Sequence, residues 1–280
     1  MEVLKLINNG SKQLQNSKIV SHRLDSEILL SKALNKTREE LLINLNQKVE
    51  KKNIEYFIEL IKRRSSKEPI AYILQEKEFW SKIFYVDRNT LIPRPETELL
   101  VETIVKIFKD KNIYALDIGT GTGCILLSIL SELKNSRGMG IDLSQKAVEI
   151  AILNAQKLKL SHRAIFCRKS LTEMYFKKFD LIVSNPPYIM KKDLKNLQDD
   201  VKKFEPKLAL DGGNDGLDVI KKVIYKSRSI LKIKGMLALE IGKGQYKKVS
   251  KILTNNKFKK RYLVRDYRQN IRCIISTFES

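Results

Sequence analysis

A glycine-rich turn between an apolar run and a helical pattern constrains the fold of this 280-residue chain most strongly. Residues 113–118 are apolar except for Asp117 and Tyr114, and apolar residues recur at helical spacing from 125 to 133. Between them stands Gly119-Thr120-Gly121-Thr122-Gly123. Glycines allow positive φ and let a ligand approach where a Cβ would clash. The pattern predicts a strand, a tight turn and a helix, the repeating unit of a parallel α/β sheet.

The spacing of these glycines excludes two common phosphate-binding loops. The dinucleotide fingerprint G-x-G-x-x-G needs its third glycine at position 124, which is Cys124. A P-loop needs Gly-Lys followed by Ser or Thr, and no lysine follows these glycines. A loop without a cationic phosphate clamp suits a cofactor without phosphates, such as S-adenosyl-L-methionine.

A second cofactor element follows at Gly140-Ile141-Asp142, where an apolar stretch ends in a carboxylate. In nucleotide-like ligands, an acid at the tip of the second strand accepts hydrogen bonds from the ribose hydroxyls. We therefore expect Asp142 to be the ribose acceptor. The alternative is a helix N-cap before Ala147, a role that Ser144 can fill instead.

The tetrapeptide Asn185-Pro186-Pro187-Tyr188 stands just after the apolar run Leu181-Ile182-Val183. It suits methylation of a planar nitrogen, whose delocalised lone pair makes it a poor nucleophile that must be oriented. Oδ1 of Asn185 can accept one hydrogen of such a nitrogen, and the carbonyl of Pro186 can accept the other. Two prolines stiffen the loop, and Tyr188 can lie flat against the target group. The alternative interpretation is a proline-rich turn that closes a buried strand.

With these motifs in order, the chain resembles the class I S-adenosylmethionine methyltransferases. It is more narrowly similar to the HemK/PrmC family, the protein-glutamine N5-methyltransferases of translation release factors. The narrower resemblance depends on stretches outside the generic motifs, at residues 68–73, 78–80, 91–98, 204–210 and 215–217.

The resemblance implies an α/β fold with a class I methyltransferase Rossmann-like sheet, mostly parallel and seven-stranded, and a small N-terminal helical domain joined by a β-hairpin linker. We expect a helical substrate-recognition domain over residues 1–75, a hairpin and linker over 76–95, and the methyltransferase domain over 96–280. A capping box at Thr37 to Glu40 predicts the start of one N-terminal helix.

The implied reaction is transfer of the methyl group of S-adenosyl-L-methionine to the side-chain amide nitrogen of the glutamine in the Gly-Gly-Gln motif of release factors. The expected catalytic residues are Asn185, Pro186 and Tyr188. The expected substrate-binding residues are Asn185, Pro186, Pro187 and Tyr188, and no metal is expected. The expected cofactor-binding residues are Asp117, Gly119, Thr120, Gly121, Thr122, Gly123, Asp142, Leu171 and Asn185.

The chain departs from the family pattern at three places. Gln75 stands where the family usually has glycine, so a different turn is expected there. Ser170-Leu171 stands about where the family tends to carry an acid and an aromatic residue beside the adenine. The stretch 266–270 lacks the glycine expected before the last strand.

Composition bounds the remaining expectations. The 54 Lys and Arg exceed the 32 Asp and Glu, giving a formal charge of +22, which favours weak contact with the ribosome or RNA through a basic surface. The alternative is a lysine-rich solvated surface. Three dispersed cysteines fit a reducing cytosol, and two isolated histidines fit neither a metal site nor a Ser-His-Asp triad. Without a signal peptide or an apolar run of membrane-spanning length, we expect a cytoplasmic protein. We also expect a monomer.

Two other functions remain open at this point. An adenine-N6 methyltransferase acting on DNA or RNA would use the same Asn-Pro-Pro-Tyr chemistry, because the adenine amine is also planar. Such an enzyme must extract its base into the pocket, usually with an added recognition region. A non-catalytic, basic module that binds the ribosome or RNA is the third hypothesis, and the intact cofactor and Asn-Pro-Pro-Tyr motifs argue against it.

Overall fold

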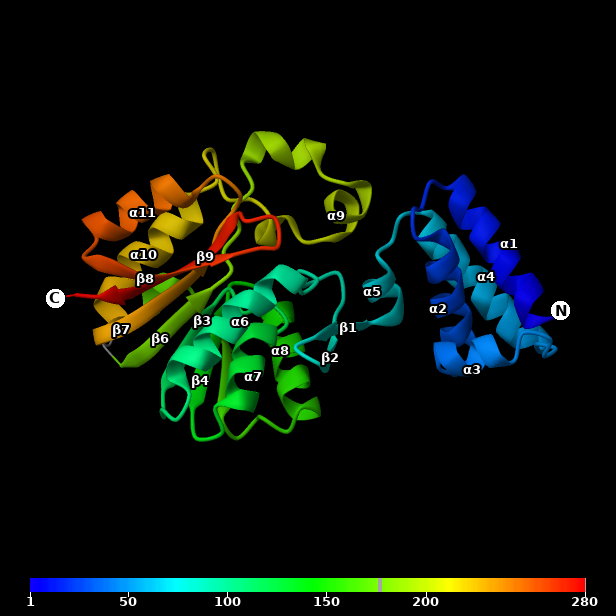
Figure 1. Cartoon of the computed structure of the whole chain (residues 1–280), viewed down its shortest axis with the longest axis horizontal. Helices are drawn as coiled ribbons and strands as arrows, with labels where there is room; N and C mark the ends of the chain where they lie inside the picture. Colours follow the sequence, from blue (N-terminus) through cyan, green and yellow to red (C-terminus); the bar gives the residue numbers. More distant parts are fainter. Residues whose placement is uncertain (176–177, 280) are drawn as a thin grey trace. The chain divides into compact units, whose positions relative to one another are not determined.

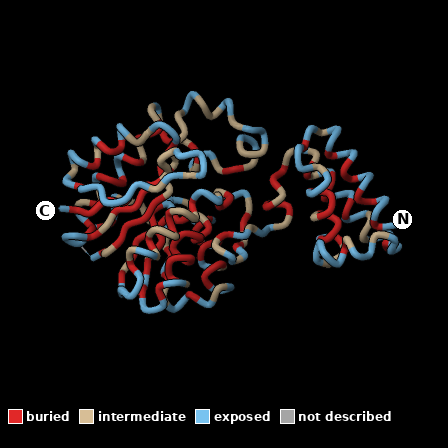
Figure 2. The backbone as a smooth tube through the Cα atoms, in the orientation of Figure 1, coloured by how far each residue is buried: buried red, intermediate tan, exposed pale blue. Residues whose placement is uncertain are grey.

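The computed structural model of the chain describes residues 1–175 and 178–279, and these residues form two compact units. The first unit holds Met1–Glu76 together with residues 198–204, and the second runs from Lys77 to Leu197 and from Glu205 onward. Each unit has its own set of buried apolar residues (Figure 2).

The first unit is helical. Leu29 and Leu30 pack with Ile7 and Leu60 in its core. The predicted capping box is present, because Thr37 accepts from the Glu40 backbone N–H at 3.2 Å and the Glu40 carboxylate accepts from the Thr37 N–H at 2.8 Å. The helices are α1 (Val3–Asn16), α2 (His22–Leu34), α3 (Arg38–Ile43), α4 (Lys51–Ser65) and α5 (Ile70–Leu74), with α9 (Asp199–Phe204) grouped beside them.

The predicted β-hairpin follows α5. It consists of β1 (Glu76–Phe79) and β2 (Lys82–Tyr85), joined by Trp80 and Ser81, both at φ +53°. Positive φ at both central residues is the geometry of the two-residue turn that matches the twist of antiparallel strands. Phe79 and Phe84 pack edge to face at 6.1 Å and belong to the core of the second unit.

Within the described residues, seven strands form one sheet in the order β5-β4-β3-β6-β7-β9-β8. Pairing is parallel from β5 to β7, and β9 is antiparallel to both of its neighbours. The expected mostly parallel, seven-stranded sheet is therefore confirmed. The strands are β3 (Tyr114–Ile118), β4 (Arg137–Asp142), β5 (Ala164–Arg168), β6 (Phe179–Ser184), β7 (Leu231–Glu240), β8 (Phe258–Arg265) and β9 (Ile271–Phe278).

Helices cover both faces of this sheet because successive strand residues point to opposite sides. Ala115 and Leu181 face one helical layer, whereas Leu116 and Ile182 face the other. The first layer is α6 (Pro95–Phe108), α7 (Cys124–Glu132) and α8 (Gln145–Lys157), and the second is α10 (Asp218–Ile230) and α11 (Tyr246–Asn255) (Figure 1). Short 3-10 turns lie at η1 (Leu171–Glu173), η2 (Lys191–Asn196) and η3 (Lys207–Ala209).

The strand order brings the loops after β3, β4 and β6 to the same edge of the sheet. From β3 the chain adds β4 and β5 on one side and then β6 and β7 on the other, so the order reverses between β3 and β6. Open α/β sheets bind ligands at such a point, outside the carboxyl ends of the strands. Ile118 pairs with Ile141 on one side and with Ser184 on the other, so the loops after β3, β4 and β6 start side by side. In the part of the chain that the structure describes, none of the helices has both the length and the apolar character needed to cross a bilayer.

Candidate active site

The glycine loop joins β3 to α7, as the sequence predicts. Gly119, Gly121 and Gly123 have φ values of +71°, +54° and +78°. A Cβ at Gly119 or Gly121 would meet no atom within 4 Å, so positive φ and an open face, rather than crowding, explain these two glycines. The N–H groups of Gly119 and Thr120 donate to the carbonyl of Ile141 at 2.9 and 3.0 Å. The loop is thus tied to the end of β4 while its outer face stays accessible.

Asp117 lies beneath this loop and is fully buried. Its Oδ2 accepts a hydrogen bond from Thr120 Oγ1 at 2.7 Å, and its Oδ1 has no partner among the described residues. Burial raises the pKa of Asp117 to about 7, and the charge of Asp142 raises it further, against the lowering effect of the Thr120 hydrogen bond. With a pKa near 7, Asp117 is partly protonated at neutral pH, unlike an exposed aspartate.

Asp142 ends β4 and faces the glycine loop. Its Oδ2 accepts from the Gly121 N–H at 3.0 Å, and its Oδ1 accepts from the Ser144 N–H at 2.9 Å. Ser144, not Asp142, caps α8, because the Ser144 hydroxyl accepts from the Ala147 N–H at 3.3 Å. Each carboxylate oxygen can accept more than one hydrogen bond, so Asp142 can still accept hydroxyl groups of a ligand.

A cavity of about 340 Å³ opens beside Asp142 at the ends of β4 and β5. One wall is Leu143, which follows Asp142 and is 56% exposed, and the other is formed by Arg168, Ser170 and their neighbours. Leu143 was not among the residues expected from the sequence, although an apolar residue directly after a strand-terminal acid is a readable signal. The expected residue Leu171 does not line this cavity; it lies in η1 and packs against the core on the α10 side.

The Asn-Pro-Pro-Tyr segment leaves the end of β6, next to the glycine loop. Asn185 is partly buried, and its Nδ2 donates to Thr97 Oγ1 at 3.3 Å. Within residues 1–175 and 178–279, no group donates to Asn185 Oδ1 or to the carbonyl of Pro186. Pro186 is buried, whereas Pro187 and Tyr188 are partly exposed. The structure thus leaves two neighbouring oxygens with lone pairs to spare at the strand end.

A buried polar network supports this segment from behind. Thr97 Oγ1 donates to Glu240 Oε2 at 2.7 Å, and the Tyr188 hydroxyl donates to Glu240 Oε1 at 3.5 Å. Arg272 donates to the Tyr188 hydroxyl at 3.4 Å, with its guanidinium 5.8 Å from the ring centre. Glu240 is 1% exposed. Burial raises the pKa of Glu240, whereas the Thr97 hydrogen bond and the Arg272 charge lower it.

The backbone of the same segment is held by Gln245 and by the chain after η3. Gln245 Nε2 donates to the carbonyls of Tyr188 and Gly216 at 3.0 and 3.1 Å. The backbone of Ile189 pairs with Asp211 in a parallel bridge. These contacts hold the far end of the segment, beyond Asn185 and Pro186.

Two of the family-like stretches also meet. Arg94 Nη2 donates to both carboxylate oxygens of Glu205, at 2.6 and 2.8 Å. Glu205 is 5% exposed, so this is a largely buried ion pair. The Pro-Arg-Pro stretch, whose last residue begins α6, is thereby joined to the chain that follows the Asn-Pro-Pro-Tyr segment.

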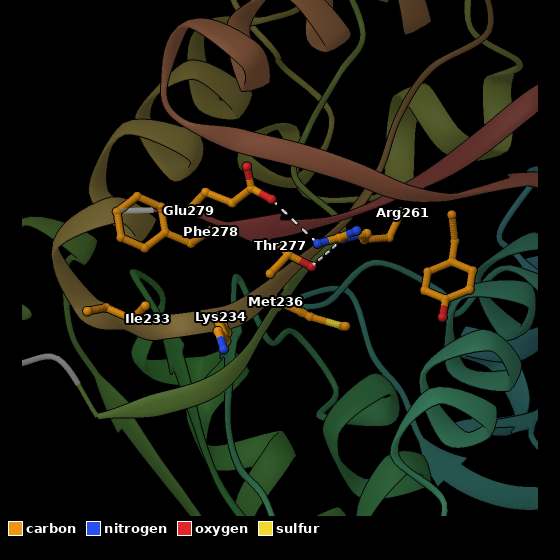
Figure 3. A pocket seen from close by; sticks show the side chains of 8 residues that line it. Ile233, Lys234, Met236, Arg261, Thr277, Phe278 and Glu279 are labelled. Atoms are coloured by element: carbon orange, nitrogen blue, oxygen red, sulfur yellow. Dashed lines mark hydrogen bonds and ion pairs between the residues drawn. The ribbon is translucent and has the colours of Figure 1, made fainter.

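A larger cavity, about 530 Å³, lies elsewhere on the sheet (Figure 3). It is lined by Ile233 and Lys234 at the start of β7, the strand that carries Glu240 at its other end. Arg261, which also lines it, donates to Thr277 at 3.2 Å and to Glu279 at 3.4 Å. These groups bond to one another at the opposite end of β7 from the glycine loop side, so the cavity is not part of the candidate active site.

Known proteins resemble the chain along both units. Residues 5–74 match the model of the PrmC N-terminal domain, and residues 95–204 match that of the methyltransferase small domain. The chain is 39% identical over 238 residues to the release factor glutamine methyltransferase of Clostridium acetobutylicum, with 84% of each chain covered. It is 38% identical over 275 residues to that of Buchnera aphidicola subsp. Acyrthosiphon pisum, with 98% of each covered.

A longer relative and two solved structures extend this picture. The bifunctional methyltransferase of Rickettsia prowazekii is 34% identical over 97% of this chain, which spans 56% of that protein. A methyltransferase from Pyrococcus furiosus superposes with a TM-score of 0.53 at 15% identity, covering 70% of this chain and 89% of that one. The ribosomal protein L11 methylase of Lactobacillus delbrueckii subsp. bulgaricus gives 0.50 at 20% identity, covering 66% and 81%. The structural likeness confirms the fold, and the sequence identity over most of the chain shows that it belongs to the family of release factor glutamine methyltransferases.

Proposed function

We propose that this chain transfers the methyl group of S-adenosyl-L-methionine to the side-chain amide nitrogen, N5, of the glutamine in the Gly-Gly-Gln motif of peptide chain release factors. The observation that carries the proposal is the pair of acceptors at the end of β6, Asn185 Oδ1 and the Pro186 carbonyl, beside the glycine loop. The names of the relatives supply the class of substrate.

The residues at the ends of β3 and β4 fit S-adenosyl-L-methionine. The face of Gly119 and Gly121 is open to a ligand, and no lysine stands in the loop to clamp a phosphate. Asp142 has lone pairs for ribose hydroxyls, and Leu143 offers an apolar face for a base. When bound, this cofactor supplies an electrophilic methyl group on a sulfonium sulfur. The residues assigned to hold it are Asp117, Gly119, Thr120, Gly121, Thr122, Gly123, Asp142 and Asn185, to which we add Leu143. The expected residue Leu171 is left out because it packs against the core.

The chain's own contribution to the reaction is to orient a poor nucleophile. Asn185 Oδ1 and the Pro186 carbonyl each accept one amide hydrogen, which fixes the plane of the nitrogen and aims its lone pair. As the nitrogen gains positive charge, both hydrogen bonds strengthen, so they stabilise the transition state more than the ground state. Tyr188 lies against the amide plane and Pro187 stiffens the turn. The methylated amide is acidic enough to lose its proton to water or through Pro186.

The two units are assigned different tasks. We assign recognition of the release factor to the helical residues 1–75, the joining role to the hairpin and linker at 76–95, and catalysis to 96–280. The match of residues 5–74 to a domain model of their own supports a dedicated role for the helices. Because release factors act on the ribosome, the enzyme is expected to work in the cytoplasm.

A basic surface on the second unit supports weak contact with RNA. The edge strand β8 exposes Lys259, Lys260 and Arg261, with Tyr262 45% exposed beside them. Exposed cations attract phosphates, and charged side chains on an edge strand also oppose pairing with a second sheet, which favours a monomer. Binding to ribosomal RNA that weakens steeply with salt, together with a monomeric mass in sedimentation, is the expected result; salt-independent binding contradicts the electrostatic contact.

The function is tested by incubating the enzyme with methyl-labelled S-adenosyl-L-methionine and purified release factor. Label should enter the wild-type factor and not a factor whose Gly-Gly-Gln glutamine is replaced. Parallel reactions contain duplex DNA or transfer RNA. Label in nucleic acid alone would favour an adenine-N6 methyltransferase, and no label with no cofactor binding would favour a non-catalytic module.

A further inference from the structure

We propose that Thr97 and Glu240 form a hydrogen-bond relay that sets which end of the Asn185 side-chain amide faces the substrate. Both are positioning residues, since neither is assigned a contact with substrate or cofactor. The inference rests on the proposed function for its meaning in catalysis, because the relay acts on the acceptor that holds the glutamine nitrogen.

The relay is buried and spans three elements. Thr97 lies in the first turn of α6 and is 2% exposed, while Glu240 ends β7 and is 1% exposed. Asn185 follows β6, the strand next to β7. The distances are 2.7 Å from Thr97 Oγ1 to Glu240 Oε2 and 3.3 Å from Asn185 Nδ2 to Thr97 Oγ1. Hydrogen bonds of this kind, shielded from water, hold their direction.

The direction follows from counting hydrogens. A threonine hydroxyl carries one hydrogen and can donate only once. Thr97 donates it to Glu240, so toward Asn185 it can only accept. The amide end that donates is the NH2 group, which therefore turns to Thr97 and sends Oδ1 the other way. Without this constraint, the Asn185 amide can rotate by half a turn. Its NH2 group would then face the NH2 group of the substrate, and two donors cannot form a hydrogen bond.

Glu240 also fixes the far end of the segment. Its second oxygen, Oε1, accepts from the Tyr188 hydroxyl at 3.5 Å, and Arg272 reaches the same hydroxyl at 3.4 Å. One buried carboxylate thus contacts both the residue that orients Asn185 and the residue that flanks the target amide. These two contacts give the buried carboxyl group of Glu240 a role next to the catalytic loop.

The test compares Thr97→Val, which keeps the shape and removes the hydroxyl, with Thr97→Ser, which restores it. The matched control is Thr103→Val on the same helix, where the hydroxyl donates to the backbone carbonyl of Leu99, one turn earlier. Thr97→Val should lower kcat for release factor methylation by about 10- to 100-fold, as expected when an amide loses its preferred orientation. The KM for S-adenosyl-L-methionine should stay within about threefold. Thr97→Ser should recover most of the rate, and Thr103→Val should keep it.

A second variant tests the relay as a unit. In Glu240→Gln the new amide can donate to Thr97 and reverse the direction of the relay, so kcat should fall as well. Residues that act through one hydrogen-bond chain give non-additive effects. The double variant Thr97→Val with Glu240→Gln should therefore be no slower than the slower single variant, whereas independent roles would multiply the two losses.

A readout without substrate separates this inference from the proposed function. In the nuclear magnetic resonance spectrum, the Asn185 side-chain NH2 signal, identified by its loss in Asn185→Ala, should exchange slowly in wild type and Thr97→Ser and faster in Thr97→Val. If wild type methylates release factor while Thr97→Val matches it in both kcat and exchange, the relay is wrong and the function stands. If wild type methylates no release factor, the function fails, and unchanged exchange in Thr97→Val would overturn the relay as well.

Discussion

Asn185 is the residue on which the chemistry depends most directly. Its Oδ1 is the side-chain acceptor beside the glycine loop, and Asn185→Ala removes that acceptor without removing the Pro186 carbonyl. Single-turnover rates should fall by about two to three orders of magnitude, the usual loss for one preorganised hydrogen-bond partner in an active site. Calorimetric affinity for S-adenosyl-L-methionine should change little. Asn89→Ala, at an exposed turn, is the control; near-wild-type turnover in Asn185→Ala would remove this residue from catalysis.

Asp142 is tested by cofactor affinity. Asp142→Ala should weaken binding of S-adenosyl-L-methionine by roughly 1.5 to 3 kcal/mol, the range for hydrogen bonds to a charged acceptor. The loss includes the bond that Asp142 makes to Gly121, which helps to hold the loop. Ser144→Ala is the matched control, because it removes the α8 cap but not the carboxylate. A dissociation constant that Asp142→Ala leaves unchanged refutes the ribose assignment.

The raised pKa of Asp117 predicts that the free energy of unfolding depends on pH. Its pKa is about 7 in the fold against 3.8 for an unperturbed aspartate, so the folded state holds a proton that the unfolded chain releases at lower pH. Because the pKa is higher in the fold, the free energy of unfolding of the protein falls as pH rises toward and through 7. Between about pH 5 and about pH 8 the fall is about 3 kcal/mol. Asp117→Asn does not titrate and should escape this loss. Urea unfolding of both proteins without cofactor measures it; parallel pH curves would show that Asp117 is ionised throughout.

The residues found from sequence and those missed differ in one respect. Asp117, Asp142 and Asn185 each lie within one residue of the carboxyl end of a strand and beside a local motif, so their chemistry can be read within a few positions. Thr97 and Glu240 are far apart along the chain and become partners only where α6 crosses the end of β7. A buried carboxylate network of this kind depends on tertiary packing, which no local pattern reports.

At the scale of elements, Gln75 shows how the chain closes a helix without glycine. Gln75 is the C-cap of α5 at φ +60° and ψ 27°, the left-handed conformation that glycine adopts most easily. The cap therefore has the conformation that favours glycine, formed here by a glutamine, and the expectation of a turn unlike that of the family stays a prediction. Gln269 does the same before β9, at φ +62°, in a turn held by Asp266.

This conformation gives a stability prediction. Gln75→Val should lower the free energy of unfolding by about 1 to 2 kcal/mol, because a β-branched residue fits the left-handed region poorly. Gln75→Gly should change it by less than about 1 kcal/mol, since the relief of strain is offset by the greater freedom of glycine in the unfolded chain. Chemical denaturation monitored by helical signal measures both. Equal stability of the two variants would place Gln75 outside the left-handed region.

Element type was predictable where the periodicity was strong. The glycine turn gave β3 and α7, and the alternation that follows gave the parallel sheet. The position of β9 between β7 and β8 could not be derived from local pattern, because strand order depends on which edges remain unpaired. The resemblance to a known family implied a mostly parallel, seven-stranded sheet and no strand order.

At the scale of the whole molecule, the two units have separate hydrophobic cores, one built around Ile7 and Leu60 and the other around the sheet. We therefore predict two transitions in scanning calorimetry. At a concentration 100 times its dissociation constant, S-adenosyl-L-methionine should raise the midpoint temperature of the unit that contains the sheet by about 5 to 10 °C. The midpoint of the helical unit should stay in place. In Asp142→Ala at the same cofactor concentration, the shift should shrink. A single transition that moves as a whole would show one cooperative unit.

The central claim is that the end of β6 holds a planar NH2 group by its two hydrogens. A crystal structure with S-adenosylhomocysteine and a peptide containing Gly-Gly-Gln tests it most directly. We expect the glutamine nitrogen within about 2.7 to 3.2 Å of both Asn185 Oδ1 and the Pro186 carbonyl, with its lone pair toward the sulfur. A glutamine bound elsewhere, or Asn185 with Oδ1 turned back to Thr97 and away from the peptide, would contradict it.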